Sequence, residues 1–200
     1  MTDQTPQESA VLYRAATTHA LRVLNGVRID QLDDPTPCSE WNVRDLIMHC
    51  IGGQQFAGGM LTGKPTGHDF GGIGTLEPVP DDVAIMSTEY QRCTAAVLAT
   101  ADDVAAMERT IVLPIATISG AEFLFTEFMD QLVHSWDLAI ATGQDATLDP
   151  ALAEAAQSLF QIGGLFGQGG MGETVEVPET ATSQDKLLAA VGRNPDHPID

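Results

Sequence analysis

The feature that most constrains the fold is a long helical pattern between residues 120 and 142. Ser119 precedes it as a suitable N-cap residue, and Gly143 follows as the residue type that commonly ends a helix. Apolar side chains recur around most of the circumference of this stretch. The pattern predicts a helix over residues 120–142 that packs against other helices.

Most of the remaining chain is also typical of helices joined by loops. Two short stretches are strand-like: residues 109–118, interrupted by Pro114, favour a small hairpin, and residues 175–177 form a second patch. We therefore expect an all-α fold, a four-helix bundle with a short extra helix, a small β element and a C-terminal extension. The other expected helices cover residues 8–28, 42–61, 81–100, 149–160 and 183–191.

The chain has 200 residues, of which 44% are hydrophobic, and this suits one domain with a sizeable core. We expect a single helical-bundle domain over residues 1–200. Within it, residues 160–200 form a C-terminal extension packed on the bundle.

The charge balance excludes two classes of partner. Nine Lys and Arg face 28 Asp and Glu, which gives a net charge of −19. Nucleic-acid binding needs a basic surface, and anionic membranes attract basic segments. We therefore expect neither a nucleic acid nor a membrane as partner.

Cysteine usage and the chain's ends indicate a reducing compartment. The three cysteines form no C-x-x-C pair, so a disulfide framework and a cysteine zinc site are both disfavoured. The first residues lack the basic and apolar regions of a signal peptide, and no apolar run reaches the length of a membrane span. These observations predict a cytoplasmic protein.

The helix over residues 120–142 carries a carboxylate and an imidazole at a spacing that suits a shared ligand. Asp130 and His134 are four residues apart, so their side chains converge on one helix face. Such a pair supplies two of the three protein ligands of an open metal site, although a charged pair on a solvated face is the alternative. Glu127 and Asp137 lie on the same arc, either as proton carriers or as solvated charges.

His49, in the helix over residues 42–61, offers a third ligand. Its neighbours are apolar, which indicates a buried histidine, and facing helices of a bundle can build metal sites from inward side chains. We interpret His49, Asp130 and His134 as candidate ligands that leave coordination positions open. Asp45, one turn earlier, either orients an imidazole or places negative charge at the helix N-terminus.

Two blocks of sequence occur together: PTPCSEWNVRDLIMH over residues 35–49 and DQLVHSWDLAIATG over residues 130–143. Together they resemble the metal-binding domains of the mycothiol-dependent maleylpyruvate isomerases, which belong to the DinB/YfiT-like superfamily. Residues 165–193 resemble an actinobacterial subgroup known only as metal-binding. The similarity covers nearly the whole chain.

The resemblance implies a DinB-like bundle with up-down-down-up helix order and a divalent metal held by His, carboxylate and His. Zinc is the common ion, and nickel is an alternative. These ligands fall on His49, Asp130 and His134, where Asp130 replaces a glutamate of the isomerase with a shorter side chain. The isomerase also has a separate C-terminal domain, for which a chain ending at Asp200 has no room.

The resemblance further implies a low-molecular-weight thiol as co-substrate, with mycothiol expected in actinobacteria. An open divalent metal lowers the pKa of a bound thiol or water and supplies a nucleophile at neutral pH. We therefore expect a metal-dependent enzyme that transfers a thiol to a small-molecule electrophile or isomerises it.

Two other functions stay open at this point. In a non-catalytic metal-binding or stress-response protein, a fourth protein ligand would close the site, and the candidates are Glu127, His68 and His19. A structural bundle with unused ligands is the other. Trp41 and Trp136 are expected to pack near helix ends, and a homodimer is an expectation that the sequence leaves open.

Overall fold

The computed structural model describes residues 5–64, 79–114, 116–158, 173–196 and 199. Most of the described chain is helical, with one small β-hairpin, so the predicted all-α class with a small β element is confirmed. The long helices are α1 (Pro6–Asn25), α2 (Val43–Thr62), α3 (Val83–Leu98) and α5 (Gly120–Ala141). The shorter elements are η1 (Ile29–Gln31), α4 (Val104–Met107), β1 (Thr110–Val112), β2 (Thr117–Ser119), α6 (Pro150–Gln157) and α7 (Ser183–Ala190).

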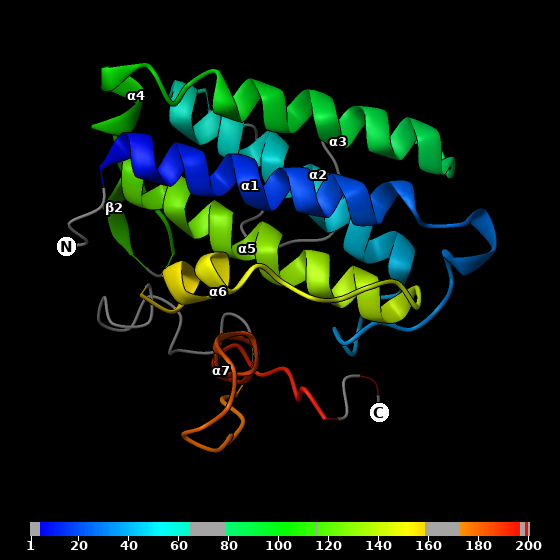
Figure 1. Ribbon diagram of the computed structural model, residues 1–200. Coiled ribbons are helices and arrows are strands. Elements are labelled where there is room, and N and C mark those ends of the chain that lie inside the picture. Colours follow the sequence, from blue (N-terminus) through cyan, green and yellow to red (C-terminus); the bar gives the residue numbers. More distant parts are fainter. Residues whose placement is uncertain (1–4, 65–78, 115, 159–172, 197–198, 200) are drawn as a thin grey trace.

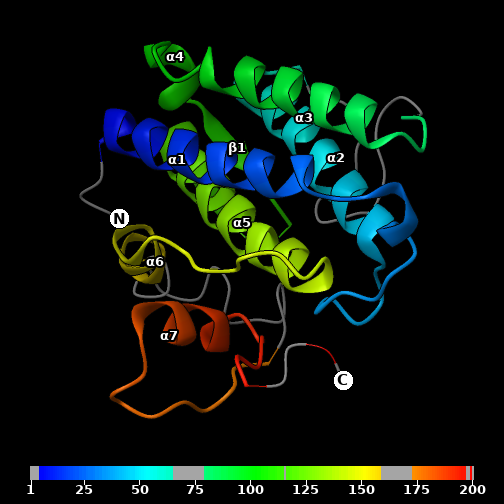
Figure 2. The same ribbon diagram turned by 45° about the vertical axis from the view of Figure 1, so that its right-hand side comes forward.

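The four long helices lie side by side (Figure 1). Both α1 and α2 contact α3 and α5, so the four helices close into a ring. In Figure 1, α1 and α5 run from left to right and α2 and α3 run the opposite way, which is the up-down-down-up order that the resemblance implied. The antiparallel hairpin of β1 and β2 leads into α5. Helix α7 packs against α6, which in turn contacts α1 and α5 (Figure 2).

Helix starts are encoded by side-chain caps. The side chains of Asn42 and Ser119 accept a hydrogen bond from the backbone three residues later, and Asp45 and Glu122 bond back to the cap residue. Each such cap is worth about 1 kcal/mol. The same capping box starts α1 at Thr5 and Glu8 and α7 at Thr182 and Asp185.

Some predicted bounds are wrong by a few residues. Helix α1 ends at Asn25 and not at residue 28, because the backbone N–H of Gly26 turns back onto carbonyls of the last turn. The predicted strand-like patch at 175–177 is not a strand. Instead, the backbone N–H of Val175 donates to the carbonyl of Ala189, at 2.9 Å, and ties this segment to α7.

Helix α5 is the central helix and is buried along most of its length. Phe123, Phe125 and Phe128 are at most 1% exposed and belong to the main apolar cluster, which also includes residues of α1, α6 and α7. Polar side chains of α5 are buried too, so its charged row does not lie on a solvated face. These buried polar residues are Thr126, Glu127, Gln131, His134, Ser135 and Asp137.

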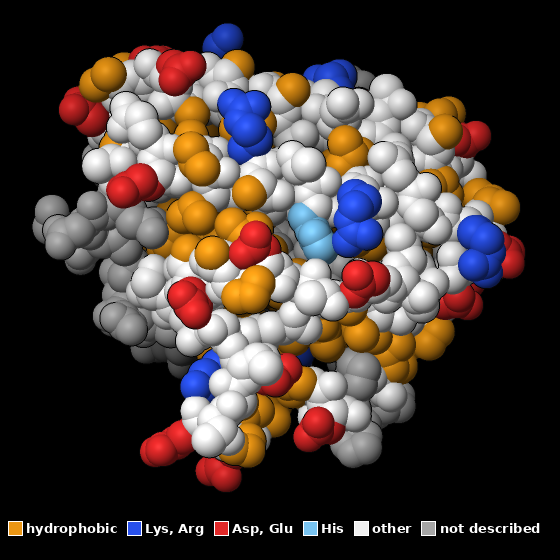
Figure 3. Space-filling view, in the orientation of Figure 1, with side chains coloured by type: hydrophobic (Ala, Val, Ile, Leu, Met, Phe, Trp, Pro, Cys, Tyr) orange, Lys and Arg blue, Asp and Glu red, His pale blue; other side chains and the backbone are white. Residues whose placement is uncertain are grey.

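Acidic side chains spread over the face shown in Figure 3 and do not gather into one patch. This agrees with the dispersed acids of the sequence. Among the helices of the described residues, none has the length and apolarity needed to cross a membrane.

Two glycines offer opposite tests of the packing. A Cβ at Gly120 would lie 2.0 Å from the backbone oxygen of Ala106, whereas a Cβ at Gly53 would meet nothing within 4 Å. We expect Gly120→Ala to lower the free energy of unfolding by about 1–3 kcal/mol, because backbone must move. Gly53→Ala lies inside α2 and should raise it by about 0.5–1 kcal/mol. Urea unfolding of both variants checks this, and a neutral Gly120→Ala would contradict the packing of α4 on α5.

Candidate metal centre

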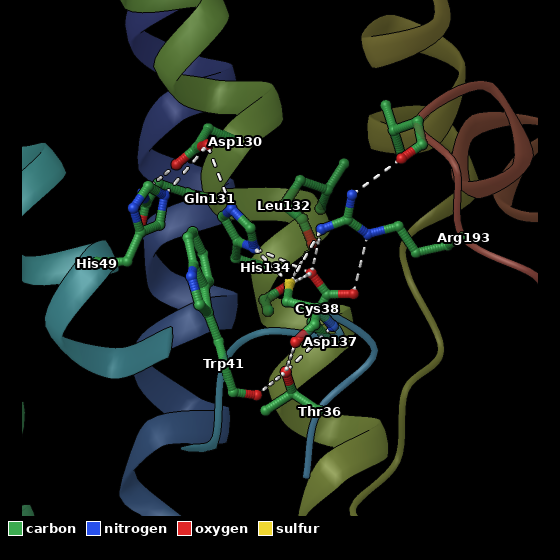
Figure 4. A network of polar contacts seen from close by, with 12 residues as sticks. Thr36, Cys38, Trp41, His49, Asp130, Gln131, Leu132, His134, Asp137 and Arg193 are labelled. Carbon is green, nitrogen blue, oxygen red and sulfur yellow. Dashed lines mark hydrogen bonds and ion pairs between the residues drawn. The ribbon is translucent and has the colours of Figure 1, made fainter. Parts of the chain in front are cut away.

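Three side chains from two helices converge between α2 and α5 (Figure 4). His49 comes from α2, and Asp130 and His134 come from successive turns of α5. Oδ1 of Asp130 lies 3.4 Å from Nε2 of His134 and 3.8 Å from Nε2 of His49. One ligand atom from each residue lies within 4.8 Å of the other two. The structure therefore brings together the three residues selected from the sequence.

The spacing and chemistry of this group suit a small divalent ion. At metal–ligand distances of about 2.0–2.2 Å, two atoms at a tetrahedral angle lie roughly 3.4 Å apart. Two imidazole nitrogens with one carboxylate oxygen form a donor set that zinc prefers and nickel accepts. The Asp130 side chain is 28% exposed, against 9% for His49 and 5% for His134, so the group meets solvent on its carboxylate side.

A second carboxylate fixes the tautomer of His134. Nδ1 of His134 lies 2.9 Å from Oδ2 of Asp137. Because an ionised carboxylate only accepts, Nδ1 carries a hydrogen, and Nε2 faces Asp130 and His49. A carboxylate behind a histidine in this way is common at metal ligands.

The charged neighbours of His134 favour a positive charge on its ring. Burial lowers the pKa of His134, but the charge of Asp130 and the bonds to Asp130 and Asp137 outweigh it and raise this pKa well above its usual range. The carboxylate of Asp130 faces Nε2 of both imidazoles, and its negative charge favours a cation between them. A proton or a metal ion can fill that position.

Arg193 holds Asp137 from the far side. Its Nε donates to Oδ1 of Asp137 at 3.1 Å and its Nη2 donates to Oδ2 at 2.7 Å. Burial would raise the pKa of Asp137, yet the charge and hydrogen bonds of Arg193 and the bond from His134 lower it to about 2. Asp137 is therefore ionised at neutral pH and can accept from His134.

The loop ahead of α2 covers one side of the site. The hydroxyl of Thr36 donates to the Trp41 carbonyl at 2.7 Å and accepts from the backbone N–H of Cys38 at 3.1 Å. The loop places the Trp41 ring 4.5 Å from the His49 ring and 5.8 Å from the His134 ring, between centroids. Trp41 was expected only to pack near a helix end, and it also lies against both imidazoles. Trp136 is buried in the main apolar cluster.

Cys38 belongs to a second group of polar side chains beside the first. Its Sγ lies 3.4 Å from Oδ2 of Asp137 and 3.3 Å from Nη2 of Arg193. Cys38, His134 and Asp137 also satisfy the spacing of metal ligands. Because Asp137 is already paired with Arg193 and with Nδ1 of His134, this group is better suited to orient His134 than to bind an ion.

The structure gives Asp45 the second of its two expected roles. Its carboxylate accepts from the backbone N–H of Asn42 at 3.3 Å and completes the capping box of α2. The carboxylate that orients an imidazole is Asp137, which the sequence had suggested as a proton carrier.

Glu127 lies in the interior near the three ligands. Burial, followed by the charge of Asp130, raises the pKa of Glu127 well above its usual range, and its Oε2 accepts from Nε2 of Gln54 at 3.1 Å. Over the described ranges, neither Glu127 nor His19 joins the group of three ligands. His68, the other candidate fourth ligand, lies outside the described residues.

Sequence reasoning missed Cys38, Trp41 and Arg193 as neighbours of the site. Arg193 is 56 residues after Asp137, so no helical spacing links the two. One signal could have suggested a partner of this kind: Asp137 sits among apolar residues of a central helix, and a buried carboxylate needs a cation.

The fold and site define a class: a helical bundle with a candidate metal centre of two histidines and one carboxylate between facing helices. Residues 13–139 match the family model of the mycothiol maleylpyruvate isomerase N-terminal domain. The chain therefore belongs to this family. Two proteins of Mycobacterium tuberculosis, MT0763 and Rv0738, are each 33% identical to it over 181 residues, which cover 86% of this chain and 90% of the relative.

Solved structures of a mycothiol-dependent maleylpyruvate isomerase have a similar fold. One has a TM-score of 0.53 at 18% identity and covers 69% of this chain. A histidine-to-alanine mutant of the isomerase gives a TM-score of 0.55 at 15% identity over 78% of this chain. The match spans 63% of the first isomerase chain and 70% of the second, so it leaves part of each solved protein without a counterpart.

The buried ion pair predicts a specific loss of stability in acid. The pKa of Asp137 falls from its ordinary 3.8 to about 2, so the pair stabilises the fold fully above pH ~4 and is lost as the pH falls through about 2. With metal removed by a chelator, the wild type should exceed Asp137→Asn in unfolding free energy by at least about 2 kcal/mol near pH 6. The difference should shrink as the pH approaches 2.

Urea unfolding over this pH range measures the effect. The matched control is Asp102→Asn at an exposed aspartate, which should stay close to the wild type throughout. A difference between the wild type and Asp137→Asn that does not change with pH would contradict an ionised Asp137 paired with Arg193.

Proposed function

We propose that this protein is a divalent-metal-dependent enzyme that uses a low-molecular-weight thiol of the mycothiol class. The observation that carries the proposal is the convergence of Nε2 of His49, Oδ1 of Asp130 and Nε2 of His134 at ligand spacing. Family membership supports the choice of thiol, since the family model and the solved neighbours are named for mycothiol and maleylpyruvate isomerisation.

In this proposal His49, Asp130 and His134 hold the ion. Zinc suits the donor set best, and nickel is the alternative. Three protein ligands leave at least one position for an exogenous molecule. The bound ion would lower the pKa of a thiol or water placed there and so supply a nucleophile at neutral pH.

The surrounding residues would then orient the metal ligands and supply a proton to the substrate. Asp137, anchored by Arg193, keeps the hydrogen of His134 on Nδ1. Trp41 shields the two imidazole rings on one side. Of the two candidate proton carriers, Asp137 is committed to its ion pair, and Glu127, whose raised pKa favours its protonated form, is the one we assign.

The reaction class is addition of the thiol to a conjugated electrophile. The thiol loses its proton, a sulfur–carbon bond forms, and the electron pair of the double bond moves onto the electrophile, which Glu127 can protonate. If the enzyme releases this adduct, the overall reaction is transfer of the thiol to the electrophile. Breakage of the same sulfur–carbon bond after rotation, with return of the proton, is isomerisation. The thiol and the three free cysteines suit the reducing cytoplasm.

A non-catalytic metal-binding protein is the alternative function. It would need a site closed by a fourth protein ligand, as structural zinc sites are. The candidate group found in the described part of the chain has three members, and its carboxylate side reaches solvent. These observations favour the enzyme.

Metal content tests the ligand set. We expect elemental analysis of the purified wild type to give about one zinc or nickel ion per chain. His49→Ala and His134→Ala should each lose most of it, whereas His19→Ala, a histidine outside the group, should retain it. Chelation should also lower the melting temperature of the wild type, because an ion bound only by the folded state stabilises that state. Full metal content in both ligand variants would refute the assignment.

Thiol dependence tests the activity. Metal-loaded protein should conjugate mycothiol to a fluorogenic electrophile, or isomerise a conjugated keto acid such as maleylpyruvate, and neither reaction should proceed without thiol. Glu127→Gln should reduce kcat on the order of 10²-fold, as expected for a lost proton carrier, with metal content unchanged. Protein with full metal content that acts on neither substrate with any small thiol would favour the non-catalytic alternative.

A further inference from the structure

Two hydrogen-bond chains, here called relays, each run from a buried tyrosine through a buried glutamine to a carboxylate of α5. In the first, the hydroxyl of Tyr90 on α3 donates to Oε1 of Gln131 at 2.7 Å, and Nε2 of Gln131 donates to Oδ2 of Asp130 at 3.0 Å. Tyr90 is 2% exposed and Gln131 is fully buried. The relay thus runs through the interior and ends on one of the three candidate ligands.

The Tyr90 hydroxyl and the Asp130 carboxylate together support one orientation of the Gln131 amide. A glutamine side chain has one accepting end and one donating end. Since the carbonyl end accepts from Tyr90, the NH₂ end must face Asp130. An amide hydrogen in that position favours an ionised Asp130 carboxylate, which accepts.

The relay also separates the two oxygens of Asp130. Oδ2 is engaged by Gln131, while Oδ1 is the atom that lies 3.4 Å from Nε2 of His134 and 3.8 Å from Nε2 of His49. Without such an anchor, a partly exposed carboxylate can rotate and offer either or both oxygens to an ion. With it, one oxygen faces the site, and Asp130 would occupy a single coordination position of a bound ion.

We propose that Tyr90 and Gln131 are positioning residues that make Asp130 a one-oxygen ligand. This inference rests on the proposed function and deepens it, because it names how the coordination sphere stays open. Loss of either positioning residue should weaken metal binding and change the geometry around the ion, although neither touches the ion.

The second relay provides a matched control. The hydroxyl of Tyr13 on α1 donates to Oε1 of Gln54, and Nε2 of Gln54 donates to Oε2 of Glu127 at 3.1 Å. Tyr13 is fully buried and Gln54 is 1% exposed. Its removal costs the same kind of buried hydrogen bond, yet this relay ends on a carboxylate outside the ligand group.

The experiment compares Tyr90→Phe, Gln131→Met and Tyr13→Phe with the wild type as full-length protein. Zinc affinity is measured by competition with a chromophoric chelator, and geometry by the visible absorption spectrum of the cobalt-substituted protein. Circular dichroism verifies that each variant is folded. We expect Tyr90→Phe and Gln131→Met to raise the Kd for zinc about 10-fold or more and to alter the cobalt spectrum. Tyr13→Phe should leave both close to wild type.

The outcomes separate this inference from the proposed function. If the wild type binds zinc and both Tyr90→Phe and Gln131→Met match it in Kd and cobalt spectrum, the positioning role is overturned and the metal centre stands. If Tyr13→Phe weakens zinc as much as Tyr90→Phe, the effect is a general loosening of the bundle, and the positioning role is again overturned. If the wild type binds no divalent ion, the proposed function fails and the inference fails with it.

Discussion

Burial of charged groups on the central helix is the constraint on which the rest of this structure depends. Asp137 and His134 are side chains of α5 that lie in the protein interior, where each unpaired polar group would lower the stability of the fold by several kcal/mol. Hydrogen bonds to the two side chains offset this penalty. The C-terminal segment brings Arg193 to Asp137, and Asp137 in turn orients His134. The contacts among Arg193, Asp137 and His134 that allow these polar side chains to be buried therefore also direct Nε2 of His134 toward the candidate metal position.

Arg193 couples the C-terminal segment to this centre. The chain has only nine Lys and Arg, and one of them is 8% exposed against Asp137. Removing either partner of such a pair leaves an uncompensated charge in the interior, which is far costlier than losing a surface pair. The guanidinium of Arg193 therefore has two effects: it attaches the segment that follows α7 to the bundle, and it keeps Asp137 ionised. Order at the site thus depends on attachment of this segment.

How much the sequence could predict depended on whether an interaction is local. Caps such as Ser119 and Asn42, and the convergence of Asp130 with His134, follow from helical spacing. The apolar neighbours of His49 predicted an inward side chain on α2, and the family resemblance then pointed to the same three residues. The partners that set the site's electrostatics are distant along the chain. Arg193 reaches Asp137 across 56 residues, and Tyr90 reaches Gln131 across 41. Such contacts depend on tertiary packing, and neither residue carries a pattern that marks it from the sequence alone.

Glu127 and Asp130 show how one helix gives two carboxyl groups different chemistry. They are three residues apart, and each accepts from a glutamine amide. Burial and the neighbouring Asp130 charge raise the pKa of Glu127, whereas His134 and His49 lower that of Asp130 against the effect of burial. Two like charges this close are avoided when one group keeps its proton. The imidazoles favour the ionised form of Asp130, and burial beside that charge favours the protonated form of Glu127. The candidate ligand and the proposed proton carrier can therefore share one face of α5 without competing for the same cation.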